Sequence, residues 1–158
     1  MHAFEYQHSR QTLADGVAEY YRSNPELVKG RGMSAAAQKF FRCHDAVHVV
    51  YGCGNTLNDE AIVKISSFFG TTGGFKVLRG YQLHESLQIY KKLRPGEVLV
   101  AIFYSIFLIP RTLLRCARQR KQWPWNNFEE YLQLPLHEIR EEFGILVAHV
   151  EANETGGV

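Results

Sequence analysis

Four residues near the middle of the chain have types and spacing suited to binding a metal ion. His44, Asp45 and His48 lie within five positions, and Glu60 follows His48 after eleven intervening residues. Residues 34–50 contain no Pro and mostly small, straight or apolar side chains, which predicts a helix. On a helix, His48 is rotated about 40° and Asp45 about 100° from His44, so all three project from one arc. Histidines four positions apart can bind one ion.

Glu60 reaches the same ion only if the chain turns after His48. On one straight helix the two residues would lie about 18 Å apart along the axis. Residues 52–55 contain two Gly and an Asn, a composition typical of a helix end and a turn. Thr56 or Asn58 can cap a new helix with Glu60 in its first turn. We expect this second helix to run back beside the first, with Glu60 facing the His pair.

Nitrogen and oxygen ligands without sulfur predict Zn, with Mg, Mn or Fe as alternatives, and an open coordination position. Taken singly, the residues have ordinary explanations: partly buried histidines, a surface Asp45, and Glu60 placed to suit the helix dipole. Together they predict a metal site, because an i, i+4 His pair next to Asp rarely has a packing reason. A thiolate ligand from Cys43 or Cys53 is disfavoured, since soft ligands usually come in closer pairs.

The spacing H-D-x-x-H, eleven residues, then E resembles the signature of the Coq4 family of coenzyme Q (ubiquinone) biosynthesis, and this chain matches it in full. Residues 128–132 and 135–145 also resemble that family, whose members usually carry Trp where Phe128 stands. The resemblance covers about residues 35–145. This chain is short for the family and lacks most of the usual N-terminal extension.

The resemblance implies an enzyme acting on a polyprenylated hydroxybenzoate-type precursor, removing its C1 carboxylate with oxidative replacement by hydroxyl. A divalent ion on His44, Asp45, His48 and Glu60 would bind the ring carboxylate or phenolate as a Lewis acid. Asp45 or Glu60 would act as the catalytic acid that moves a proton, and the sequence leaves open which. Expected partners are the prenylated precursor or another isoprenoid lipid, other quinone-biosynthesis proteins, and further copies of the chain in a homo-oligomer.

Two other functions use the same residues. One is a non-enzymatic prenyl-lipid-binding scaffold that organises the biosynthetic complex around a structural metal with a closed shell. The other is an HD-type phosphohydrolase, which needs another upstream His and a separate downstream Asp. Here the upstream histidines are His2 and His8, near the terminus, and the downstream Asp is Asp59, so this function is disfavoured.

Composition limits the remaining choices. The 158 residues suffice for one domain, and 46% hydrophobic content excludes global disorder. A net charge of +2 argues against a nucleic-acid partner. Three cysteines without C-x-x-C spacing fit a reducing cytoplasm. Residues 1–10 resemble neither a signal nor a transit peptide, so we expect a bacterial-type cytoplasmic protein that is soluble or peripheral to a membrane.

Apolar periodicity predicts an all-α, single-domain helical bundle. Residues 98–109 are apolar on all sides, which places their helix at the centre of the bundle, and Pro110 should kink or end it. The tail from about 151 to 158 should be frayed. The expected helices are residues 12–24, 35–51, 57–69, 75–93 and 97–121.

Two further groups of residues are candidates for lipid contact. Walls for an isoprenoid tail are expected from Phe68, Phe69, Phe103 and Phe107, with His84 near the metal or a substrate passage. The ordinary alternatives for these residues are core packing or a satisfied polar position.

The second group of residues predicts a membrane-interface patch, where cations meet anionic lipid and Trp lies at headgroup level. Its alternative is a solvated basic face near a helix C-terminus. Its members are Arg111, Arg115, Arg118, Trp123 and Trp125.

Overall fold

The structure, a computed structural model, describes residues 1–25, 34–82 and 95–149, and only the backbone of residues 81, 82 and 95–105. These described residues form six α-helices and no strand, which confirms the expected all-α fold. The helices are α1 Leu13–Ser23, α2 Ala35–Val50, α3 Leu57–Phe69, α4 Val77–Gln82, α6 Pro95–Ala117 and α7 Leu136–Phe143, with 3₁₀ turns η1 Ala3–Glu5, η3 Gly74–Lys76 and η4 Phe128–Tyr131.

Local signals set the ends of α2 and α3, and both helices match the predicted ranges within one residue. The Ser34 side chain accepts the backbone N–H three residues on. Thr56 does the same for Asp59, whose carboxylate accepts the Thr56 N–H in return, a capping box. Between the helices, Gly52 adopts φ +63°, which L side chains rarely take. A Cβ there would also lie 2.9 Å from the Val147 side chain.

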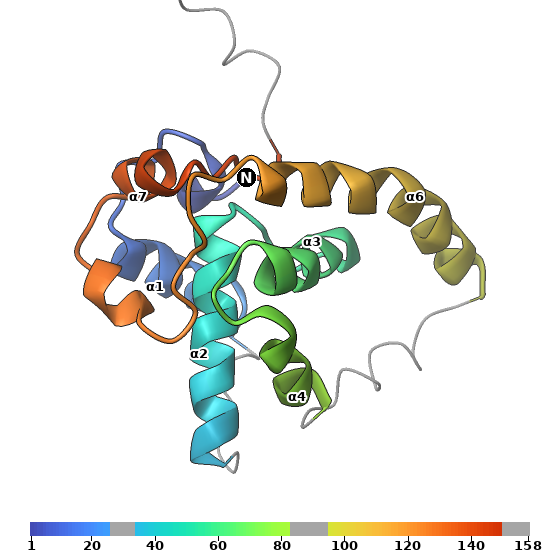
Figure 1. Ribbon diagram of the computed structural model, residues 1–158, viewed down its shortest axis with the longest axis horizontal. Helices are drawn as coiled ribbons and strands as arrows, with labels where there is room; N and C mark the ends of the chain where they lie inside the picture. The colour runs from blue at the N-terminus through green and yellow to red at the C-terminus, as the bar shows by residue number, and fades with distance from the viewer. Residues whose placement is uncertain (26–33, 83–94, 150–158) are drawn as a thin grey trace, which may run out of the picture.

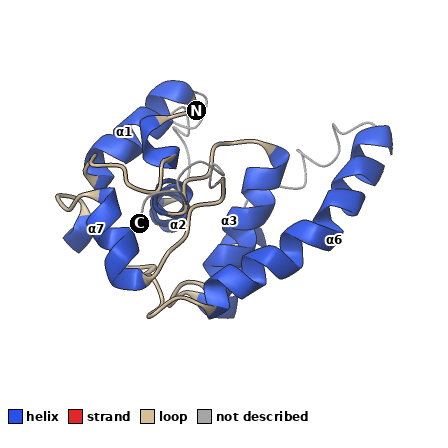
Figure 2. Ribbon diagram, turned by 90° about the horizontal axis from the view of Figure 1, so that it is seen from above, coloured by secondary structure: helices blue, strands red, loops and turns tan. Residues whose placement is uncertain are grey.

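The central element is α2, which contacts α1, α3 and α7 (Figure 1). Figures 1 and 2 show from two directions that α3 crosses α2 instead of running back beside it. The expected side-by-side pairing of the two helices is therefore wrong. Glu60 still reaches α2, because it lies in the first turn of α3, directly after the connecting turn. The predicted helix at residues 75–93 begins as η3 and α4, and its remainder lies outside the described residues, as does the tail from residue 150.

The helix α6 lies at the edge of the fold, where it packs along α3 (Figure 2). Its Ile106, Phe107 and Leu114 are 60%, 67% and 50% exposed. The prediction of a central helix is therefore wrong: an apolar composition does not guarantee burial when neighbours cover one side only. The helix passes through Pro110 without ending. In the described part of the chain, no helix is long and apolar enough to cross a membrane.

Trp123 and Trp125 belong to the core, so their predicted position at a membrane is wrong. Trp123 is fully buried, with its ring 5.0 Å from that of Tyr131 and 5.2 Å from that of Phe143. Trp125 is 6% exposed and lies beside Phe40. The chain folds back after α6 and carries both indoles inward, a tertiary effect that the preceding run of basic residues does not reveal.

Arg140 on α7 joins three parts of the chain. Its side chain is buried, and its five N–H groups donate to five backbone carbonyls rather than to a carboxylate. Burial lowers its pKa to about 10, so the guanidinium stays charged at neutral pH. Two acceptors are at the C-terminal end of α2, where the helix dipole is negative and favours a cation. The acceptors are Phe4, Tyr6, Gln7, Val49 and Val50.

Replacing Arg140 by Met should lower the free energy of unfolding by about 3 kcal/mol or more, because buried carbonyls lose their donors. Arg140→Lys should recover only part of this loss, since one ammonium cannot reach acceptors in so many directions. Urea denaturation measures both. Arg22→Met, at an exposed position in the last turn of α1, is the control and should change stability by less than about 1 kcal/mol. Equal losses of unfolding free energy in Arg22→Met and Arg140→Met would contradict the role given to the Arg140 hydrogen bonds.

Candidate metal site

Side chains from α2 and α3 bring three ligand atoms together. One ligand atom each from His44, His48 and Glu60 lies within 4.8 Å of the others, and this group can hold a metal ion. Glu60 Oε1 lies 3.3 Å from His48 Nε2, and Oε2 lies 3.8 Å from His44 Nε2. Ligands about 2.0–2.1 Å from a tetrahedral Zn²⁺ are about 3.4 Å apart. The predicted grouping of these three residues is confirmed.

The orientation of the His48 ring directs an electron pair at the centre of this group. Its Nδ1 lies 2.7 Å from the Gly54 carbonyl oxygen. A carbonyl only accepts, so Nδ1 carries the hydrogen, and in the neutral ring the lone pair is on Nε2. That nitrogen is buried and lacks a hydrogen bond of good geometry among the described residues. A lone pair facing a carboxylate is repulsive, and a cation between them removes the repulsion.

Asp45 lies behind His44, outside the group of three ligand atoms. Its Oδ1 is 3.4 Å from His44 Nδ1, the nitrogen on the other side of the ring from Glu60. Its Oδ2 accepts a hydrogen bond of 2.8 Å from the Tyr21 hydroxyl. Both carboxylate oxygens thus have partners away from the ligand group. Asp45 is placed to orient the imidazole, as carboxylates behind metal-binding histidines do.

Aromatic rings hold both imidazoles in place. Tyr20 stacks on His48, with ring centroids 5.0 Å apart and planes 27° apart. Phe40 stacks on His44 at 6.1 Å and 25°. Phe40 also packs against α4, because Gly80 approaches it so closely that a Cβ would collide with the ring. The histidines therefore have little freedom to rotate, which preorganises the site.

The charge at the site rests on Glu60. Burial raises the pKa of its carboxyl, but when the two rings are protonated a hydrogen bond from His48 and the charges of His44 and His48 outweigh burial and hold the pKa at about 2. A divalent cation between the three side chains would keep Glu60 ionised in the same way. Its side chain is 29% exposed, whereas those of His44 and His48 are 8% and 0% exposed. Access to the ligand atoms is consequently from the Glu60 side.

The cysteines that flank the motif are placed away from metal chemistry. Cys43 and Cys53 are both buried and free, and neither belongs to the ligand group. Burial raises the pKa of Cys43 to about 11 and that of Cys53 well above its ordinary value. Both therefore remain thiols, which are poor metal ligands.

The residues predicted to line a lipid tail are spread over several surfaces. Phe68 is half-buried and Phe69 is 46% exposed, and both contact Phe75, which is 69% exposed. These three rings form an aromatic cluster at the end of α3. Phe107 lies on the exposed face of α6, a separate element. Phe103 lies in α6 and only its backbone is described, while His84 is outside the described residues.

Sequence reasoning missed a polar pair behind the site. His149 Nε2 lies 2.6 Å from Oδ1 of Asp59, the neighbour of Glu60 in the first turn of α3. Asp59 is buried and also closes the capping box with Thr56. This contact ties the C-terminal segment to the start of the helix that carries Glu60. The two residues are 90 positions apart, and no local pattern links them.

Comparison of this chain with protein-family models, with curated proteins and with solved structures gives no match.

The double variant His44→Ala/His48→Ala should purify without metal while keeping its helical circular dichroism. Asp45→Asn keeps the shape of the side chain but loses its charge, so it should still bind metal with an affinity about 10–100-fold lower. Metal analysis of protein prepared without chelator, followed by competition with a chelator, measures both. Equal metal content in wild type and the double variant would show that the ion binds elsewhere.

Replacing His149 by Gln should destabilise the protein at acidic pH only. The hydrogen bond with Asp59 raises the pKa of His149 above 6.5 despite partial burial. A raised pKa contributes stability that is fully present below pH 6.5 and is lost as the pH rises through the folded-state value. The effect at pH 5.5 should be below about 1 kcal/mol, since His149 is half exposed.

Thermal unfolding from pH 5 to 9 measures the dependence, with the exposed His8→Gln as the control. A difference between wild type and His149→Gln that persists unchanged at pH 9 would mean that the contact acts through shape rather than charge.

Proposed function

We propose that the protein is a metal-dependent enzyme of the Coq4 type in ubiquinone biosynthesis. Its substrate would be a polyprenylated hydroxybenzoate-type precursor, from which it removes the C1 carboxylate. The observation that carries the proposal is the convergence of His44, His48 and Glu60 with the His48 lone pair aimed at Glu60. The H-D-x-x-H-x11-E spacing, which resembles the family signature, supports the choice of substrate.

His44, His48 and Glu60 would hold the ion, and their two nitrogens and one carboxylate favour Zn, with Mg, Mn or Fe as alternatives. A divalent ion bound there supplies Lewis acidity toward a ring carboxylate or phenolate. Three protein ligands leave a position open, a feature of catalytic sites rather than closed structural ones. The partial exposure of Glu60 puts that open position on the accessible side.

The two carboxylates would have different roles. Glu60 faces the accessible side, and its low pKa suits a permanent ligand better than a proton carrier. Asp45 is buried between Tyr21 and His44, where it would act as a positioning residue. Tyr20 and Phe40 would fix the imidazoles and keep water from their faces.

The exchange of carboxylate for hydroxyl is an oxidation. In balanced form, the ring acid and one water give the ring alcohol, carbon dioxide, two protons and two electrons. The bond between the ring and its carboxyl carbon breaks, and a new bond forms between the ring and oxygen. The two electrons must pass to an external electron acceptor, so the proposal requires an oxidant or a redox partner in the assay.

The second candidate function is a prenyl-lipid-binding scaffold with a structural metal. The exposed aromatic cluster of Phe68, Phe69 and Phe75 favours contact with an isoprenoid chain under either function. Catalytic turnover distinguishes the enzyme from the scaffold, because a scaffold needs the ion only to maintain its structure.

Glu60→Gln should abolish coenzyme Q formation in a cell that depends on this protein, while the variant still folds and keeps its helical circular dichroism. Gln keeps the shape of Glu but loses the charge. Glu138→Gln, at an exposed carboxylate in the first turn of α7, is the matched control and should leave quinone at the wild-type level. Chromatography of quinones at equal protein levels is the measurement.

Build-up of the carboxylated precursor in the Glu60 variant would support the enzyme. Normal quinone at a normal protein level would favour the scaffold instead.

A further inference from the structure

The outer face of α6 carries a stripe that alternates apolar and basic side chains. Phe107, Arg111, Leu114 and Arg118 are spaced by four, three and four residues, so they lie within about 60° of one another around the helix. All four are exposed. The opposite side of α6 packs on α3, where Cys116 Sγ lies 3.9 Å from a serine hydroxyl. The stripe therefore lies on the side of α6 that faces away from α3.

The sequence around the stripe has a single sign of charge. Residues 98–128 contain five Arg or Lys and no Asp or Glu, whereas the whole chain has 18 basic and 16 acidic residues. Charge of one sign around exposed apolar side chains is typical of surfaces that meet anionic membranes. Phe107 and Leu114 are 67% and 50% exposed, and large exposed apolar side chains that lie together often mark an interaction site.

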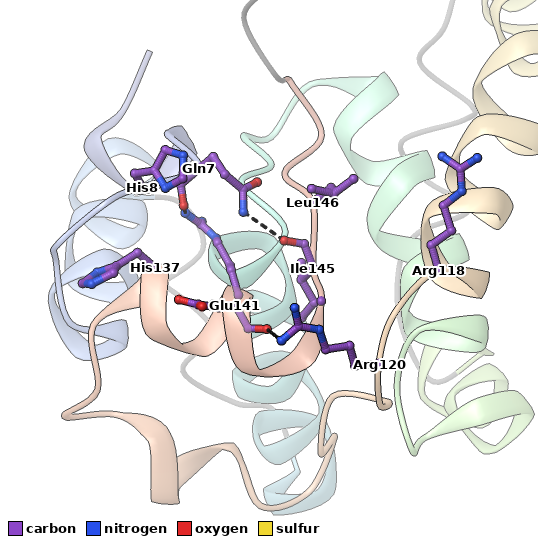
Figure 3. A pocket seen from close by; sticks show the side chains of 10 residues that line it. Gln7, His8, Arg118, Arg120, His137, Glu141, Ile145 and Leu146 are labelled. Carbon is purple, nitrogen blue, oxygen red and sulfur yellow. Dashed lines mark hydrogen bonds between the residues drawn. The ribbon is translucent and has the colours of Figure 1, made fainter. Parts of the chain in front are cut away.

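A hollow of about 650 Å³ continues this surface beyond the C-terminal end of α6. Figure 3 shows Arg118 and Arg120 toward α6, and His8 and His137 on the far side. Leu146 lies between them and is 48% exposed. The lining includes the carboxylate of Glu141, but cationic and imidazole groups outnumber it. The hollow thus offers donors to an anionic group next to an exposed apolar side chain.

We propose that the α6 stripe and this hollow form a docking surface for an anionic phospholipid membrane. Phe107, Leu114 and Leu146 enter the outer acyl region, where their burial is favourable. Arg111 and Arg118 pair with lipid phosphates, which Arg binds through two parallel hydrogen bonds. The predicted roles of Arg111 and Arg118 are kept in this proposal, and the apolar partners are new. Arg115 and Arg120 are excluded, because their guanidinium groups donate to the carbonyls of Ala148 and Glu141.

Two other occupants fit the surface less well. A second copy related by a two-fold axis would place the same patch on both sides of the interface, so Arg111 and Arg118 would face their own copies without acidic partners. A nucleic acid would satisfy the arginines but would leave Phe107 and Leu114 without an apolar environment. Anionic lipid satisfies both kinds of side chain.

The experiment is co-sedimentation of the full chain with phosphatidylcholine vesicles, with and without phosphatidylglycerol. Wild type should bind the anionic vesicles, and added salt should weaken binding. Arg111→Glu/Arg118→Glu and Phe107→Ser/Leu114→Ser should each reduce binding about 10-fold or more. The surface does not include the metal ligands, so the result is independent of whether the site is catalytic.

Matched controls separate this surface from general attraction. Arg10→Glu/Arg22→Glu changes the net charge by the same amount at other exposed positions and should leave binding near the wild-type value. Leu78→Ser/Leu134→Ser removes two exposed apolar side chains from α4 and from the segment before α7, and it should also leave vesicle binding near the wild-type value.

The proposal would be overturned if Arg10→Glu/Arg22→Glu lost as much vesicle binding as Arg111→Glu/Arg118→Glu. It would also be overturned if Leu78→Ser/Leu134→Ser lost binding while Phe107→Ser/Leu114→Ser kept it. The proposal would also be overturned if wild type failed to bind vesicles and light scattering showed a wild-type dimer that dissociates in the Phe107→Ser/Leu114→Ser variant.

Discussion

The hydrogen bonds of Arg140 hold together the two ends of the chain and the end of α2. A buried guanidinium without a carboxylate is costly unless every N–H has an acceptor, and here five carbonyls supply them. Two of those carbonyls belong to Val49 and Val50, the last residues of the helix that carries His44 and His48. The same contact that closes the fold therefore fixes the end of α2 from which the chain turns toward Glu60.

The candidate site is rigid because each group is held on the side away from its ligand atom. Gly54 holds His48 through Nδ1, Asp45 faces Nδ1 of His44, and Tyr21 in turn holds Asp45. Each Nε2 is left to point toward Glu60. The arrangement combines negative charge, low exposure and one accessible side, conditions under which a bound cation interacts strongly with its ligands and still meets a substrate.

Sequence patterns predicted what depends on local chemistry. Ser34, Thr56 and the Gly-rich turn fix the bounds of α2 and α3, and the His44–His48 spacing follows from helix geometry. Properties set by distant neighbours were not predictable. Burial of Trp123 depends on α7, and exposure of α6 depends on what covers it. The partners of Arg140 are backbone carbonyls, which every residue has, so its role leaves no sequence signature.

The turn at Gly52–Asn55 also bears on the order of folding. His44 and Glu60 are 16 positions apart, so the unit of α2, turn and α3 closes a short loop at low entropic cost. The contact between Arg140 and Phe4 spans 136 positions and must close nearly the whole chain. Contacts of low sequence separation generally form faster. The unit of α2, turn and α3 can thus form before the termini meet. An ion bound at that stage would stabilise the crossed arrangement of α2 and α3, around which the rest of the chain then packs.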